Sequence, residues 1–194
     1  MNLDPSEGWE SIAERFTAVR SDIGASLVRS WAQDHLPTAG SVIDVGCGSG
    51  VPITHALIED GFEAFAIDAS PALIAAFRRR FPQVQAACEA AQDSAFFHRT
   101  FDGAVSIGLL FLLQEVDQGE VICRVARSLR PGGRFLFSAP REACEWPDLL
   151  TGRPSRSLGE KEYERLLRVS GLRLAGCHVD EGGNNCFDAA KPLG

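Results

Sequence analysis

The first forty residues carry two apolar patterns with the spacing of a helix. The apolar positions are Trp9, Ile12, Phe16 and Val19, and then Ile23, Leu27, Val28 and Trp31. Side chains that recur every three or four residues share one face of a helix, so this spacing predicts two amphipathic helices before residue 41.

From Ser41 onward, short apolar runs alternate with segments of helical period. The predicted strands are SVIDVG, EAFAID, VQAAC, FDGAVSIG and GRFLFSAP, followed by LRLAGCHV and NNCFDAA on either side of the turn DEGG. The predicted helices are 52–59, 70–80, GEVICRVARSL and LGEKEYERLLRVS. Strands that alternate with helices favour a largely parallel sheet covered on both faces, and the terminal hairpin adds an antiparallel strand.

Local signals predict where several of these helices begin. Ser70 is expected to cap the helix that opens at Pro71. Asp117 with Glu120, and Ser157 with Glu160, have the spacing of capping boxes. The segment 141–157 is the longest stretch without a period, and we interpret it as an irregular loop at the functional edge of the sheet. The chain is thus expected to be one α/β domain, with a core at 41–194 and N-terminal helices at 1–40 that cover the site.

Composition narrows the range of partners. The chain has 194 residues, 45% of them hydrophobic, and its net charge is 19 − 26 = −7. This acidic balance argues against a nucleic-acid partner, and no apolar run reaches the roughly 20 residues of a membrane span. The polar start lacks the pattern of an export signal, and six cysteines without a CxxC pair predict reduced thiols in a cytoplasm and no metal site.

The stretch SVIDVGCGSG places three glycines directly after a predicted strand. Ligands of open α/β sheets bind at the carboxyl ends of strands, so this glycine-rich turn is a candidate ligand-binding loop. A tight turn that binds no ligand can have the same composition. Asp68 ends the next predicted strand, where a carboxylate can accept hydrogen bonds from both ribose hydroxyls. The three glycines have the spacing GxGxG, and the carboxylate of Asp44, just before the first glycine, would repel phosphate groups. This pattern favours a ligand with a ribose and a positive centre over a dinucleotide.

These motifs resemble those of the class I S-adenosylmethionine-dependent methyltransferases. VIDVGCGSG is similar to the family's first motif, AIDAS to its second, FDGAVSIGLLFLL to its strand-four segment and LRPGGRFLFSAP to the segment through strand five. The resemblance covers roughly 31–194. It implies a Rossmann-like, doubly wound seven-stranded sheet of order 3-2-1-4-5-7-6 with strand 7 antiparallel, and it implies S-adenosylmethionine as the cofactor.

The resemblance also implies cofactor-binding positions. Asp44 and the glycine loop should hold the methionyl group, Asp68 the ribose, and Ala69, Glu89 and Ala90 the adenine, while Ser106 and Ile107 should line the methionyl arm. The implied set is Asp44, Gly46, Cys47, Gly48, Gly50, Asp68, Ala69, Glu89, Ala90, Ser106 and Ile107. The sequence CEA at Glu89 departs from the commoner GDA of the family, so a surface glutamate is an alternative there.

The expected activity is in-line methyl transfer to a small molecule, because the chain has no added recognition domain and no [DNS]PP[YFW] motif follows strand four. Orientation and water exclusion supply much of such catalysis, and no residue is identified as a necessary base. The candidate acceptor-site residues are Leu110, Trp146, Arg153 and Asn184.

Two alternatives stay open at this point. One is a catalytically silent cofactor-binding scaffold, and the other is thiol or arsenite methylation that uses Cys144, Cys177 or Cys186. The identity of the acceptor and the oligomeric state are not predicted.

Overall fold

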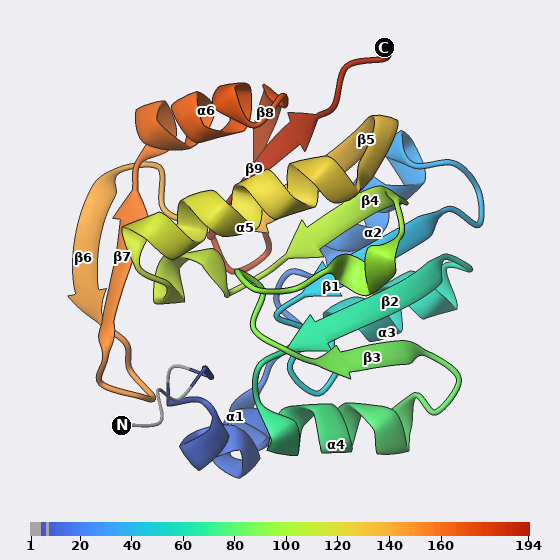
Figure 1. Ribbon diagram of the computed structural model, residues 1–194. Helices are drawn as coiled ribbons and strands as arrows, with labels where there is room; N and C mark the ends of the chain where they lie inside the picture. Colours follow the sequence, from blue (N-terminus) through green and yellow to red (C-terminus); the bar gives the residue numbers. More distant parts are fainter. Residues whose placement is uncertain (1–4, 7) are drawn as a thin grey trace.

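Seven strands form a single mixed sheet in the computed structural model, which describes residues 5, 6 and 8–194 (Figure 1). The strands are β1 (Ser41–Val45), β2 (Glu63–Asp68), β3 (Gln85–Cys88), β4 (Phe101–Ser106), β5 (Leu129–Ser138), β8 (Arg173–Val179) and β9 (Asn185–Ala190). Their order is β3-β2-β1-β4-β5-β9-β8, and β9 runs antiparallel to both of its neighbours. The predicted order, with an antiparallel seventh strand, is confirmed.

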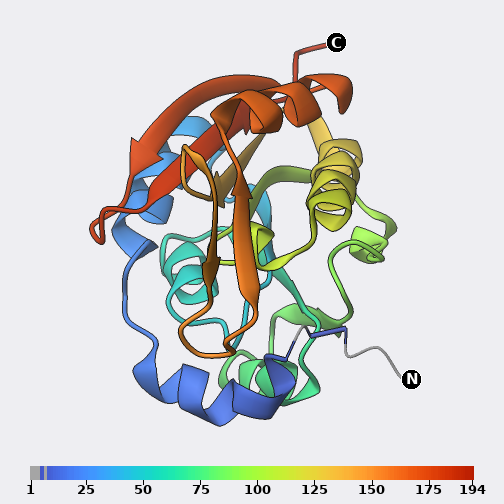
Figure 2. The ribbon, with the colours of Figure 1, turned by 90° about the vertical axis from the view of Figure 1, so that its left-hand side faces the viewer.

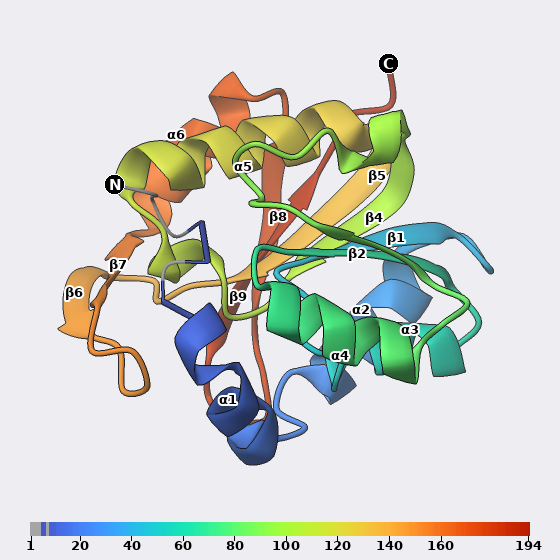
Figure 3. The same cartoon turned by 60° about the horizontal axis from the view of Figure 1, so that its bottom comes forward.

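Helices cover both faces of this sheet. They are α1 (Ala13–Val19), α2 (Ala25–His35), α3 (Ile53–Glu59), α4 (Pro71–Arg80), α5 (Glu115–Ser128) and α6 (Glu160–Val169), with short 3-10 turns η1 (Glu10–Ile12), η2 (Phe96–His98) and η3 (Leu110–Leu112). Figure 3 shows α5 and α6 on one side and α2, α3 and α4 on the other. The alternation along β1 explains the two layers: Ile43 packs in the cluster that contains Val121, while Val42 packs with Leu57.

The segment 141–157 is not the irregular loop that its sequence predicts. It forms a separate hairpin of β6 (Ala143–Pro147) and β7 (Pro154–Leu158), which lies at the left of the main sheet in Figure 1 and faces the viewer in Figure 2. Four of the five β6 residues are exposed, so the strand lacks the apolar alternation by which strands are identified. The strand is instead held against β7 by backbone pairing and by an ion pair between Glu145 and Arg156 (3.4 Å).

Two of the three predicted helix starts are wrong. Helix α5 begins at Glu115, so Asp117 lies inside its first turn and caps nothing. Helix α6 is preceded by Gly159, and the Ser157 hydroxyl donates to the carbonyl of Pro140 (2.7 Å). The predicted cap at Ser70 is confirmed, because its Oγ accepts from the N–H of Leu73 (3.2 Å).

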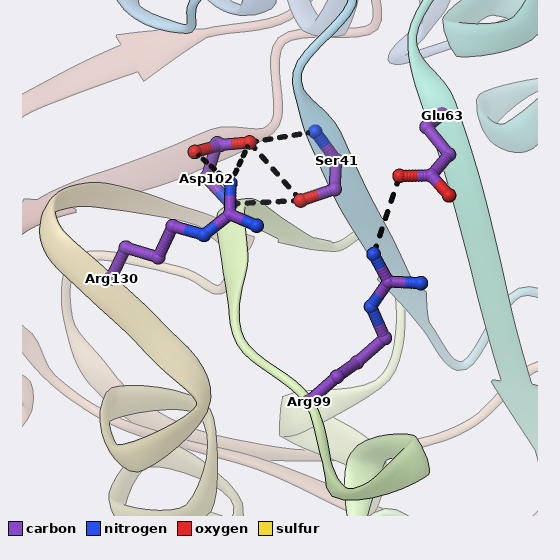
Figure 4. A network of polar contacts seen from close by, with 5 residues as sticks. All are labelled: Ser41, Glu63, Arg99, Asp102 and Arg130. Atoms are coloured by element: carbon purple, nitrogen blue, oxygen red, sulfur yellow. Dashed lines mark hydrogen bonds and ion pairs between the residues drawn. The ribbon is translucent and has the colours of Figure 1, made fainter.

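Side-chain contacts close the amino edge of the sheet, as Figure 4 shows. Asp102 accepts from the backbone N–H of Ser41 (2.8 Å) and from both its hydroxyl (3.1 Å) and the Arg130 guanidinium (2.7 Å). Arg99 donates to Glu63 on β2 (3.3 Å). These contacts tie β1, β2 and β4 together at one end and leave the opposite, carboxyl edge for a ligand.

Candidate functional site

A cavity lies at the carboxyl edge of β1, β2 and β4. Nine of the eleven predicted cofactor residues line it: Asp44, Gly46, Cys47, Gly48, Asp68, Ala69, Glu89, Ala90 and Ile107. The order of the strands brings these residues together, because β1 pairs with β2 on one side and with β4 on the other. Residues as far apart in sequence as Asp44 and Ile107 (107 − 44 = 63 positions) therefore meet at one edge.

The glycine loop after β1 is tied to β2 by its own backbone. The N–H groups of Gly46 and Cys47 both donate to the carbonyl of Ile67 (2.9 and 3.0 Å). Gly48 has a φ of +56°, and a Cβ atom there would lie 3.1 Å from the ring of Phe16. The loop thus needs glycine both for its conformation and for the narrow space above it.

Asp68 at the end of β2 organises the loop from the other side. Its Oδ2 accepts from the N–H of Gly48 (2.8 Å), and its Oδ1 accepts from the N–H of Ser70 (2.9 Å). Burial raises the pKa of Asp68, while these two hydrogen bonds act in the opposite direction. A carboxylate has about four acceptor positions, so Asp68 keeps room for further donors from a ligand.

Asp44 is a buried carboxyl group in the wall of the same cavity, with 1% of its surface exposed. Thr54 donates to its Oδ2 (2.6 Å). Burial raises the pKa of Asp44 to about 7, although the Thr54 hydrogen bond and the charge of Arg20 oppose the shift. An ionised carboxylate in this position favours a cation beside it.

The N-terminal segment lies over the cavity and contributes residues that the sequence did not identify as site residues. Trp9 and Phe16 line the cavity and pack edge to face, with ring centroids 5.0 Å apart. Glu10 fastens the segment to α4, since it accepts from the Ser70 hydroxyl and from the N–H of Ala72 (3.0 Å). Helix α2 instead packs on the sheet, where Trp31 is buried in the cluster of Val42.

Arg20 follows α1 and carries the one basic side chain among the described residues that line the cavity. Its guanidinium carbon lies 5.7 Å from the centroid of the Phe16 ring. Burial lowers the pKa of Arg20, while the charges of Asp44 and Asp180 raise it. The sequence predicted that the N-terminal helices cover the site, but no local pattern indicated that Phe16 and Arg20 are the residues that line the cavity.

Six predicted site residues lie outside the cavity walls, and three of these are packed within the protein. Gly50 packs against α4, where an added Cβ would lie 2.6 Å from Phe81. The hydroxyl of Ser106 donates to the carbonyl of Val45 (3.0 Å), and Leu110 is fully buried in the core. Their positions favour structural roles over contact with a ligand.

The other three candidate acceptor residues are dispersed. Trp146 packs against Phe111 (centroids 5.5 Å apart), and Arg153 lines a small hollow beside Trp9. Asn184 donates through Nδ2 to Asp180 (3.1 and 3.0 Å) and lines a second cavity. The structure therefore does not gather them into one site.

Within the described residues, no group of three or more His, Cys, Asp or Glu side chains is arranged to hold a metal ion. The described part of the chain also contains no helix that is both long and apolar enough to span a membrane.

The comparisons with known proteins agree with this geometry. A family model described as a methyltransferase domain matches residues 42–133, which include the glycine loop, β2 and β4. This matched segment, slightly less than half of the chain, is similar to methyltransferase domains. An uncharacterized methyltransferase of Mycobacterium bovis is 35% identical over 101 residues, 52% of this chain and 40% of that protein. The match thus spans less than half of this relative's length.

Solved structures share the fold of this chain. The glycopeptide N-methyltransferase MtfA, in complex with S-adenosylhomocysteine, has a TM-score of 0.72 and 21% identity, with 92% of this chain and 96% of that chain covered. The Burkholderia thailandensis 1,6-didemethyltoxoflavin-N1-methyltransferase, with its substrate and S-adenosylhomocysteine bound, has a TM-score of 0.74 and 23% identity, with 94% and 84% covered. At these identities the likeness concerns the fold.

Proposed function

We propose that this chain binds S-adenosylmethionine in the cavity beneath the N-terminal segment and transfers its methyl group to a small molecule. The observation that carries the proposal is the pair of carboxylates, Asp44 and Asp68, on either side of a glycine loop whose backbone faces the cavity. A ligand with a cation and a ribose fits this pair. The small-molecule and glycopeptide acceptors in the names of the similar solved structures support the acceptor class.

Different residues of the cavity are suited to different groups of the ligand. Asp44 is suited to a cationic amino group, Arg20 to a carboxylate and Asp68 to ribose hydroxyls. The bound cofactor supplies a methyl group activated by a sulfonium. Trp9 and Phe16 exclude water from above, and the protein thereby contributes orientation and a dry environment to the transfer.

A transfer assay tests the proposed activity. The protein is incubated with S-adenosylmethionine labelled in its methyl group and with a cell extract separated into small molecules, proteins and nucleic acids. We expect the label in the small-molecule fraction and no transfer by the Asp68→Ala variant. Label in protein or nucleic acid would overturn the acceptor class. Binding without transfer to any fraction would favour the silent scaffold.

The Arg20→Ala substitution should selectively lower the affinity for ligands that carry a carboxylate. S-adenosylhomocysteine has the amino acid group, whereas 5′-methylthioadenosine lacks it and keeps the adenosine. Loss of one charge-assisted contact should reduce affinity for S-adenosylhomocysteine by about tenfold or more. Calorimetric titration with both ligands measures the difference. An equal loss for the two would mean that Arg20 supports the N-terminal segment and does not bind the carboxylate.

The pKa of Asp44 predicts a pH dependence of binding. Only the ionised carboxylate attracts the ligand's amino group, and the pKa of Asp44 is raised to about 7, so protonation competes with binding as the pH falls. Affinity for S-adenosylhomocysteine should be highest above pH 7 and should decline toward a limit of about tenfold per pH unit below it. The Asp44→Asn variant should bind weakly at every pH and lose this decline. A parallel decline in both proteins would assign it to another group.

The positions of the cysteines do not support the alternative of thiol or arsenite methylation. Cys144 lies exposed on β6, while Cys177 and Cys186 lie on β8 and β9, and none of the three lines the cofactor cavity. Burial raises the pKa of Cys186 to about 12, which disfavours the thiolate needed to bind a soft acceptor. We therefore do not propose thiol or arsenite chemistry.

A further inference from the structure

A second cavity adjoins the cofactor cavity at the carboxyl ends of β4 and β5 and at the amino end of the antiparallel strand β9. The two cavities share Arg20, Ile107, Gly108 and Phe111 in their walls. The second cavity extends from this shared wall toward Ser138 and Asn185. A molecule held in it would therefore lie next to the ligand of the first cavity.

Asn185 belongs to the wall of this second cavity and has one side-chain atom without a hydrogen-bond partner. Its Nδ2 donates to the carbonyl of Ala139 (3.0 Å), which fixes the orientation of the amide, because the flipped form would bring two oxygens together. Its Oδ1 is buried and has no hydrogen-bond partner. A buried acceptor that lacks a donor is costly, and such groups in cavity walls are suited to a ligand's N–H or O–H.

A second polar group lies in the same wall. The Ser138 Oγ accepts from the N–H of Gly108 (2.7 Å), and this bond leaves its own hydrogen free to donate. Ile23, Ile107 and Phe111 supply apolar surface around the two polar groups. An apolar cavity with a few placed polar groups is typical of sites for small organic molecules.

Most of the charges around this cavity are already paired. Asp180 accepts from the backbone N–H of Gly182 (2.9 Å) and from Asn184, and Arg141 is paired with Glu160 (2.6 Å). Arg20, in the shared wall, is flanked by the carboxylates of Asp44 and Asp180. The cavity therefore offers hydrogen bonds and apolar contact more than net charge.

We propose that the second cavity binds the methyl acceptor, and that the acceptor is a neutral, ring-containing molecule whose nucleophilic nitrogen or oxygen carries a hydrogen donated to Asn185 Oδ1. The proposal rests on the proposed function. In the transfer, a lone pair on this nitrogen or oxygen forms the bond to the methyl carbon, the electron pair of the broken carbon–sulfur bond stays on sulfur, and the displaced proton passes to water.

Matched ring compounds test the hydrogen-bond requirement without knowledge of the natural acceptor. The pairs are aniline with N,N-dimethylaniline, phenol with anisole, and 2-pyridone with N-methyl-2-pyridone. Their binding to protein saturated with S-adenosylhomocysteine is measured by ligand-observed NMR. We expect the N–H or O–H member of a pair to bind about fivefold or more tightly than its methylated partner, as one hydrogen bond to a buried oxygen implies.

Variants assign this preference to one side chain. Asn185→Ala should equalise the members of each pair, and the neighbouring Asn184→Ala, which removes an amide already engaged with Asp180, should keep the preference. Thermal unfolding verifies that both variants are folded. Equal binding in the wild-type protein, no binding of any pair to the loaded protein, or a preference that survives Asn185→Ala would each overturn the proposal. Failure of S-adenosylhomocysteine to bind at all would instead overturn the proposed function.

Discussion

Asp68→Ala should reduce the affinity of the protein for S-adenosylhomocysteine by about a hundredfold or more. The substitution removes the proposed acceptor for two ribose hydroxyls, and hydrogen bonds to a charged group contribute about 1.5–3 kcal/mol each. It also releases the N–H groups of Gly48 and Ser70, which the carboxylate now holds at 2.8 and 2.9 Å. The substitution should therefore remove the contact with the ligand and also disturb the conformation of the glycine loop. Calorimetric titration measures the change.

Two further variants separate these effects. Asp68→Asn keeps one oxygen to accept hydrogen bonds and should lose less affinity than Asp68→Ala. Asp102→Ala removes another hydrogen-bonded carboxylate of the same sheet, but at the amino edge, and should leave affinity unchanged in the folded protein. Wild-type affinity in Asp68→Ala would show that this carboxylate does not bind the ligand.

Gly50→Ala should lower the free energy of unfolding by about 2–4 kcal/mol, the range for overpacking combined with a strained backbone. The φ of Gly50 is +83°, and the added methyl group would lie 2.6 Å from Phe81 and 2.7 Å from Phe77. Both rings are buried beneath α4, so neither can move without disturbing the packing there. Urea unfolding followed by circular dichroism measures the loss.

Gly61→Ala is the matched control for this loss. Gly61 has nearly the same φ, +85°, but nothing lies within 4 Å of an added Cβ. The Gly61→Ala substitution should therefore lower the free energy of unfolding only by the backbone strain, about 1 kcal/mol. Equal losses at the two positions would show that the two phenylalanine rings relax and that packing does not require glycine at position 50.

The architecture of the sheet follows from the sequence for a physical reason. Buried parallel strands such as β1 are apolar on both faces, so SVIDV is distinct from the amphipathic helices around it. The carboxyl ends of such strands meet at one edge, which is why Asp44 and Asp68 could be assigned to one site from their positions near the carboxyl ends of successive strands.

The parts that the sequence did not predict depend on contacts between distant segments. The exposed strand β6 pairs with β7 without an apolar face of its own. Gly50 shares its loop with Gly48, but it faces the rings of Phe77 on α4 and of Phe81 just after it, whereas Gly48 faces Phe16 over the cavity. Arg20 and Asn185 acquire their surroundings from strands and turns far along the chain. No local pattern carries that information.

Calorimetric titration of the wild-type protein with S-adenosylhomocysteine tests the central claim most directly, with NAD as the control ligand. We expect saturable binding of one S-adenosylhomocysteine per chain and no binding of NAD, because Asp44 beside the glycine loop favours a cation and repels phosphates. Folded protein that releases no binding heat with millimolar S-adenosylhomocysteine, or that binds NAD instead, would contradict the account.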